Sequence, residues 1–178
     1  MTAPSPERIP AELRAAKRWL CWKLEDVGRP KKAKVPYTVN GRRARTTDER
    51  DWSTFDEACA AAGRYDGIGF VFTGTPYAGV DLDGAIGDGG MTATAQEFVD
   101  ALPGAYAERS QSGHGVHLIV RGQLPPGGRR KDDVEMYDTT SPRYFAITGD
   151  VLGAPVETIP DHTSALHTLH TKYIGGGL

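Results

Sequence analysis

The sequence is poor in cysteine, has no long apolar run and carries almost no excess charge. Its 178 residues include two cysteines, Cys21 and Cys59, which lie far apart and follow no metal-ligand spacing. This pattern argues against a disulfide scaffold and predicts reduced thiols. No apolar stretch reaches the roughly 18 residues that a bilayer requires, so we expect no membrane-spanning helix. The opening MTAPSPERIP lacks the apolar core of a secretion signal, which predicts a cytoplasmic protein.

The charge is nearly balanced overall but unevenly distributed along the chain. A formal net charge of -2 gives no global signature of nucleic-acid binding. One stretch, however, carries seven basic residues and no acid: Arg29, Lys31, Lys32, Lys34, Arg42, Arg43 and Arg45. A second, smaller cluster spans 129–131. Charge alone favours solvated surface over a binding site at both places.

Composition and pattern predict one globular domain of the α+β class. We expect helices over 11–17, 53–63 (capped by Ser53), 92–102 and 163–173, and strands over 18–25, 35–39, 67–74, 77–83, 115–122, 133–138 and 143–149. The short turn between 67–74 and 77–83 predicts a hairpin, and 133–138 is expected to pair with 143–149. Residues 1–9 read as a disordered lead, 10–174 as the folded domain, and 175–178 as the start of a linker to a further domain.

Two acids at the end of an apolar run are the first candidate site. Asp81 and Asp83 stand at i and i+2, which places both side chains on one face of a strand. Neighbouring carboxylates repel each other unless a cation lies between them, and Mg²⁺ binds one or two carboxylates together with substrate phosphates. Glu135, within VEMY, offers a third acid.

Other interpretations of these acids remain open. A solvated turn at Asp83-Gly84 explains the pattern without any metal. A calcium loop is disfavoured, because Ile86 and Thr92 stand where glycine and an acid are needed. A sugar-nucleotide transferase would need a longer chain with a parallel sheet. Glu135 alone is equally typical of an exposed strand face.

A glycine-rich turn before a strand is the second candidate site. In SQSGHGVHLIV, Ser112, Gly113 and Gly115 precede His117. Free N–H groups of such a turn can form a nest for an anion, and His117 can donate to a phosphate. The alternative for His117 is a half-buried strand histidine. His162, His167 and His170 lack an acid or cysteine to complete a zinc set, so a solvated helix face is favoured for them.

Seven motifs in a fixed order resemble the archaeo-eukaryotic primase superfamily. Within it, the chain is similar to the primase-polymerase domains at the front of phage and plasmid replication proteins, which often carry a helicase behind. The resemblance covers about residues 10–155. It rests on KVPY, W-x-x-F-x-x-A, GIGFVF, VDLD, SGHGVHLIV, VEMYD and RYFAITG.

The resemblance implies a fold and a set of roles. The fold would be a mixed or antiparallel sheet resembling an RNA-recognition motif, packed with a smaller N-terminal α/β module. Asp81, Asp83 and Glu135 would hold two Mg²⁺ or Mn²⁺ ions, with Asp138 competing for the third place. The incoming triphosphate would be bound by His117, by the turn residues Ser112, Gly113 and Gly115, and more weakly by Lys34 and Arg143. Template contacts are expected from Arg29, Lys31, Lys32, Arg42, Arg43 and Arg45.

The implied activity is template-directed DNA priming or polymerisation on single-stranded DNA, in the cytoplasm of a bacterial host. Its partners would be single-stranded DNA, nucleoside triphosphates and a helicase, in the same longer chain or in trans. Two alternatives stand beside it. One is a catalytically silent module that binds single-stranded DNA for a replication helicase. The other is a different metal-dependent nuclease or nucleotidyltransferase that uses the same acids.

Overall fold

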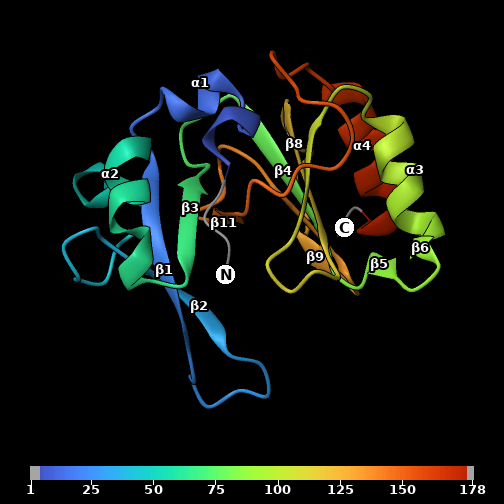
Figure 1. Ribbon diagram of the computed structural model, residues 1–178. Coiled ribbons are helices and arrows are strands. Elements are labelled where there is room, and N and C mark those ends of the chain that lie inside the picture. The colour runs from blue at the N-terminus through green and yellow to red at the C-terminus, as the bar shows by residue number, and fades with distance from the viewer. Residues whose placement is uncertain (1–4, 176–178) are drawn as a thin grey trace.

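The computed structural model describes residues 5–175, which form two antiparallel sheets with helices against them (Figure 1). The four-stranded sheet has the order β11-β3-β1-β2, with β11 at Tyr144–Ile147, β3 at Gly67–Val71, β1 at Trp19–Glu25 and β2 at Ala33–Tyr37. The five-stranded sheet has the order β7-β8-β4-β10-β9, with β7 at Tyr106–Arg109, β8 at Val116–Arg121, β4 at Tyr77–Leu82, β10 at Val134–Tyr137 and β9 at Arg130–Lys131. A small ribbon pairs β5 (Ile86–Gly87) with β6 (Gly90–Met91). The expected α+β class is confirmed.

Four α-helices complete the part of the chain that the structure describes: α1 at Ala11–Arg14, α2 at Phe55–Ala61, α3 at Ala93–Ala101 and α4 at Thr163–Tyr173. Short 3₁₀ turns lie at Pro6–Arg8, Glu49–Asp51 and Ala62–Arg64. In Figure 1, α2 lies beside the four-stranded sheet, and α3 and α4 cover the outer face of the five-stranded sheet. No helix within residues 5–175 is long and apolar enough to cross a bilayer.

Helix α2 is capped one residue later than expected. The side chain of Thr54, not Ser53, accepts a hydrogen bond from the Glu57 N–H. Ser53 instead donates its hydroxyl to the carbonyl of Trp19, 3.0 Å away, and joins the edge of the first strand. The local sequence pattern predicted that Ser53 caps the helix, whereas in the fold this residue bonds to the first strand.

The expected disordered lead falls partly on described residues. Residues 1–4 lie outside the described part of the chain, as do residues 176–178 of the expected linker. Pro6–Arg8 forms a 3₁₀ turn, and Ile9 is 1% exposed within the main core. Packing therefore begins at least one residue before the predicted start at residue 10.

Two expected strand pairings are wrong, because in each case the two strands belong to different sheets. β3 and β4 do not form a hairpin, because β3 lies between β11 and β1 whereas β4 lies between β8 and β10. β10 and β11 likewise belong to different sheets. The apolar residues of β3 and β4 are buried in continuous runs, because both faces of each strand are covered by packed side chains. Short connections cross between the sheets instead of closing local hairpins.

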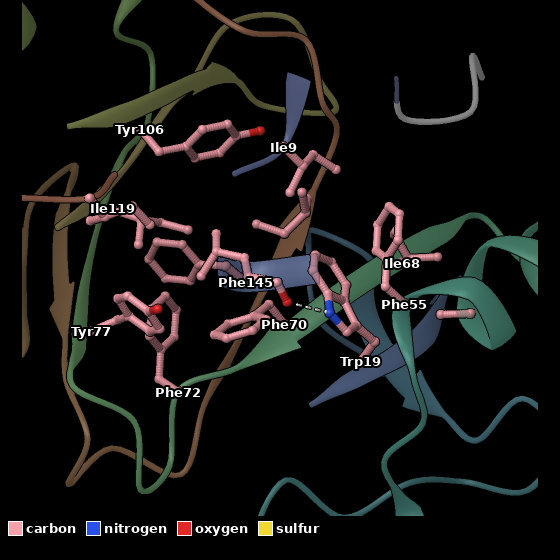
Figure 2. Packing of buried hydrophobic residues seen from close by; sticks show 14 of the residues in the cluster. Ile9, Trp19, Phe55, Ile68, Phe70, Phe72, Tyr77, Tyr106, Ile119 and Phe145 are labelled. Atoms are coloured by element: carbon pink, nitrogen blue, oxygen red, sulfur yellow. Dashed lines mark hydrogen bonds between the residues drawn. The ribbon is translucent and has the colours of Figure 1, made fainter. Parts of the chain in front are cut away.

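The main core is rich in aromatic rings and packs between the two sheets and α2 (Figure 2). Trp19 packs edge-on against Phe55 of α2 and Phe70 of β3, with ring centroids 4.8 and 5.3 Å apart. Its indole N–H donates to the carbonyl of Leu13, 2.9 Å away, which fixes α1 to the four-stranded sheet. A second core fills the space between the five-stranded sheet and helices α3 and α4.

A glycine in β4 lets the two sheets approach each other. A Cβ atom at residue 79 would lie 2.6 Å from Phe145 and 2.7 Å from Phe72, closer than atoms can approach. Glycine therefore admits the Phe145 ring onto the surface of the five-stranded sheet. That ring also lies 5.3 Å from the imidazole of His117, so the close approach shapes the site described next.

Candidate active site

A row of five ionisable side chains crosses the five-stranded sheet, one from each strand. Each member is the direct cross-strand partner of the next in the antiparallel register. Direct partners share a face of the sheet. From one edge to the other the row runs through Glu108, His117, Asp81, Glu135 and Arg130. Three members of this row were predicted from the sequence.

A cavity of about 370 Å³ lies over the middle of this row, between the two sheets. The five-stranded sheet contributes Asp81, His117, Glu135 and Tyr137 to its lining. The opposite side brings Lys34 from β2 and Arg143 from the segment before β11. Acids thus line one wall and cations the other. The other lining residues are Pro36, Thr46, Pro142, Tyr144, Phe145 and Ala146.

Asp81 stands at the centre of the row in an unfavourable electrostatic position. Its carboxylate lies 3.6 Å from Nε2 of His117. Burial raises the pKa of Asp81, and the negative charges of Asp83 and Glu135 raise it further, against the opposing effects of His117 and Lys34. A carboxylate that is crowded by other carboxylates is stabilised in its charged form by an added cation.

His117 is buried and held from two sides. Its Nδ1 lies 2.9 Å from the Glu108 carboxylate, and the Phe145 ring packs against the imidazole. Burial acts to lower the pKa of His117, but the hydrogen bond to Glu108 and the charges of Asp81 and Glu108 outweigh it, so the pKa is raised. The ring therefore presents Nε2 toward Asp81 and the cavity.

Glu135 is restrained by two neighbours that sequence reasoning did not identify. Arg130 of β9 lies 3.1 Å from one carboxylate oxygen, and the Tyr137 hydroxyl donates to the other at 2.7 Å. Tyr137 stands two residues along the same strand, so the two side chains share a face. The guanidinium of Arg143 lies 5.4 Å from the centre of the Tyr137 ring, which joins the two walls of the cavity.

Asp83 lies apart from the other two predicted ligands. It is exposed, follows the end of β4, and lines a second cavity of about 320 Å³ together with Lys131, Asp132 and Asp133. Among the described residues, no three His, Cys, Asp or Glu side chains are grouped so as to hold a metal ion. Asp81 and Glu135 nevertheless fit a hard divalent cation, because they are adjacent carboxylates that both line the main cavity.

Three N–H groups of the glycine-rich turn form hydrogen bonds within the turn itself. The N–H of Gly113 donates to the carbonyl of Ser110, and that of Gly115 donates to the Ser110 hydroxyl. The N–H of His114 lies 3.3 Å from the hydroxyl of Ser112. None of the predicted contacts Ser112, Gly113 and Gly115 is among the residues lining the main cavity. The turn closes the β7–β8 hairpin and so fixes the position of His117.

The predicted template-binding residues fall into two groups. Arg29, Lys31 and Lys32 are exposed at the tip of the β1–β2 hairpin, which projects from the body of the molecule (Figure 1). The arginines that follow β2 meet acids from other parts of the chain. Arg43 pairs with Glu25 at 3.0 Å, Arg45 pairs with Asp48 at 3.0 Å and with Asp51 at 2.9 Å, and Arg42 lies 3.8 Å from Asp51. The charge of the second group is therefore partly neutralised. The sequence did not suggest this, because no acid lies within the basic stretch itself.

Three members of the site have little signal in the sequence. Glu108 lies in a short strand that was not predicted, between two apolar residues and a turn. Arg130 was assigned to a solvated basic cluster. Tyr137 stands two residues from Glu135, and that period-two spacing is the one signal in the sequence that identifies it.

Comparison with known proteins gives one informative similarity. No protein-family model matches the chain. The chain is 36% identical over 146 residues to the DNA primase-polymerase of Nitratiruptor phage NrS-1. The match covers 75% of this chain and 19% of that phage protein, so the chain spans about a fifth of the length of this relative.

Proposed function

We propose that this chain is a catalytic domain that adds nucleotides to a growing strand on a single-stranded DNA template. The observation that carries the proposal is the cavity in which Asp81, Glu135 and His117 face Lys34 and Arg143. Adjacent carboxylates opposite two cations suit a substrate that brings both metal ions and phosphates. The similarity to part of a phage DNA primase-polymerase supports the same reaction class.

The carboxylates would hold Mg²⁺ or Mn²⁺. Asp81 and Glu135 face the cavity, and Asp83, which lines the second cavity two residues beyond Asp81, would turn toward them to supply the third ligand. Two bound ions would lower the pKa of the attacking 3′-hydroxyl and neutralise the charge of the departing pyrophosphate. Arg130 and Tyr137 hold the Glu135 carboxylate in place at the edge of this arrangement.

The cationic side of the cavity would bind the triphosphate. Lys34 and Arg143 extend from the four-stranded side, and Nε2 of His117 faces the same space. These groups would neutralise phosphate charge, which every nucleoside triphosphate carries, so they would select for a triphosphate and not for a particular base. Positioning and charge neutralisation of this kind supply most of the catalysis in phosphoryl transfer.

The exposed hairpin tip would contact the template. Arg29, Lys31 and Lys32 project from the sheet that also contributes Lys34, so basic charge extends from the tip toward the cavity. Contacts between basic side chains and phosphates follow the DNA backbone, and they weaken as the salt concentration rises. Because the phage relative is about five times longer than its matched part, we propose that this domain works beside a further replication domain, such as a helicase, in a bacterial cytoplasm.

Substitution of the acids tests the proposal. Asp81→Ala and Asp83→Ala are expected to abolish nucleotide addition while binding of single-stranded DNA persists. His117→Ala is expected mainly to raise the apparent KM for the nucleotide. Asp100→Asn, on the exposed face of α3, is the matched control and should leave activity unchanged. Full activity in either aspartate variant would refute the metal-binding role.

A second candidate is a silent module that binds single-stranded DNA. It is favoured by the position of Asp83, which does not converge with Asp81 and Glu135. It predicts intact DNA binding with no synthesis under any metal condition.

A further inference from the structure

The carboxylate of Glu108 is completely buried and forms an unusually full set of hydrogen bonds. Its side chain has no solvent exposure. One oxygen accepts from the Tyr106 hydroxyl at 2.6 Å and from the Gly149 N–H at 3.0 Å. The N–H of Thr148 lies 3.0 Å from both oxygens, and Nδ1 of His117 lies 2.9 Å from the other oxygen. Burying a carboxylate costs less free energy when hydrogen bonds satisfy both of its oxygens in this way.

These donors determine which nitrogen of His117 carries a proton. The backbone N–H groups and the tyrosine hydroxyl all donate to Glu108, so the group acts as an acceptor on both oxygens. The remaining contact is therefore a hydrogen bond in which Nδ1–H of His117 donates. Nε2 is then the nitrogen that faces Asp81, at 3.6 Å, and the cavity beyond it.

The same carboxylate also joins the two walls of the cavity. Thr148 and Gly149 follow β11 of the four-stranded sheet, whereas Tyr106 and His117 belong to the five-stranded sheet. Phe145, also of β11, packs its ring against the imidazole. Glu108 therefore contributes both to the orientation of His117 and to the contact between the two sheets.

We propose that Glu108 is a positioning residue that fixes the ring orientation and tautomer of His117, so that Nε2, which donates when the ring carries a proton on both nitrogens, faces the phosphates of the incoming nucleotide. The contact with phosphate rests on the proposed function, whereas the tautomer does not. This assignment adds to the site a residue that never touches substrate. It also predicts a spectroscopic signature that can be measured without any activity.

The first test uses the unmodified chain and ¹⁵N NMR of its histidine side chains, with His117→Ala to identify the signal. We expect a proton on Nδ1 of His117 whatever the charge of the ring. An Nδ1 without a proton would overturn the inference. This measurement needs neither a variant that alters the pair nor a bound ligand.

The second test is Glu108→Gln, which keeps the shape but has one acceptor oxygen. The backbone N–H groups and Tyr106 would face that oxygen, leaving the amide NH₂ to donate to Nδ1. We therefore expect the neutral ring to carry its proton on Nε2. The carboxylate that holds the ring is replaced by a neutral amide, which forms a weaker hydrogen bond, so the looser ring should raise the apparent KM for the nucleotide about 10-fold to 100-fold with a smaller change in kcat. Asp51→Asn removes a buried acid that pairs with Arg45, far along the chain from this pair, and should alter stability without altering the tautomer.

The two tests separate the inference from the function on which it rests. An unchanged tautomer in Glu108→Gln overturns the positioning role. A changed tautomer with an unchanged KM supports the orientation by Glu108 but contradicts the contact between His117 and the nucleotide. Equal loss of activity in Asp51→Asn and Glu108→Gln, with the His117 signal unmoved in both, would assign Glu108 to stability alone.

Discussion

Asp81 and Glu135 stand directly opposite each other on neighbouring antiparallel strands, and both line the main cavity. Side chains in such positions are separated by only about 5 Å at Cβ, and like charges there destabilise the sheet. Arg130 and Tyr137 engage Glu135 from its far side, and His117 lies beside Asp81. The fold therefore maintains a repulsion at the point where the proposed reaction needs a cation.

This repulsion predicts how stability responds to divalent metal. Mn²⁺ or Mg²⁺ should raise the melting temperature of the unmodified chain, because an ion that binds only the folded state stabilises it. Asp81→Asn should melt above the unmodified chain in metal-free buffer, since one of two opposed charges is removed, and should lose the response to metal. Thermal denaturation with and without chelator measures both effects, with Asp100→Asn as control. An equal metal response in Asp81→Asn would contradict the site.

Acid sensitivity is expected from Glu12, which ties α1 to the five-stranded sheet. Its carboxylate accepts hydrogen bonds from Tyr77 and Arg121 at 2.6 Å each, and from the N–H of Ile159 at 3.0 Å. Burial acts to raise the pKa of Glu12, but these three donors outweigh it and the pKa is lowered. The stabilisation is therefore complete above the pKa of the unfolded chain and is lost as pH falls through the folded value.

Glu12→Gln tests this dependence. We expect a loss of about 1–2 kcal/mol in unfolding free energy at neutral pH, and a difference from the unmodified chain that shrinks steadily below about pH 4.5. Urea denaturation at a series of pH values measures it, with exposed Glu7→Gln as the matched control. A difference that stays constant down to acid pH would show that Glu12 acts through packing and not through charge.

The two groups of basic residues should behave differently toward DNA. The double variant Lys31→Ala/Lys32→Ala should weaken binding of single-stranded DNA. The slope of the logarithm of the binding constant against the logarithm of the salt concentration should become shallower by about one to one and a half, because each phosphate contact contributes roughly 0.7. Removal of the exposed Arg8 and Lys17 removes the same charge elsewhere and should alter the slope less. Fluorescence anisotropy across a salt series provides the measurement. Equal effects of the two pairs would point to general charge instead of a binding hairpin.

Gly79→Ala should loosen the contact between the sheets. The added methyl group would meet Phe145 and Phe72, so one ring must move. Overpacking of this kind costs about 1–3 kcal/mol of unfolding free energy. Since Phe145 packs on His117, we expect a larger loss of nucleotide addition than of DNA binding. Gly87→Ala, in an open position, is the control, and equal stability of the two variants would contradict the packing argument.

Local pattern predicted the elements well and their partners poorly. Helix α4 begins and ends at the predicted residues, and Asp81, His117 and Glu135 do share one face. The pairing of β3 with β4 was wrong because both strands are central, and the choice of partner in a central strand depends on residues far along the chain. Period-two alternation fixes a face but not a neighbour.

The site shows the same limit. Glu108 and Arg130 enter the row through register alone, and nothing beside them in the sequence marks them as partners of His117 and Glu135. The arginines after β2 appeared free because the acids that neutralise them, Glu25, Asp48 and Asp51, lie outside the basic stretch. A stretch of sequence therefore shows how many basic residues lie close together along the chain, whereas the fold determines which of them remain available to bind DNA.

Nucleotide addition by the purified chain tests the central claim most directly. The reaction contains single-stranded DNA, labelled nucleotides and Mn²⁺ or Mg²⁺, with and without an annealed primer, and Asp81→Ala as the inactive reference. The account predicts metal-dependent, template-directed products that Asp81→Ala does not form, and products without a primer would identify priming as well as extension. Absence of product under both conditions, with DNA binding intact, would contradict the catalytic assignment and leave a binding module in its place.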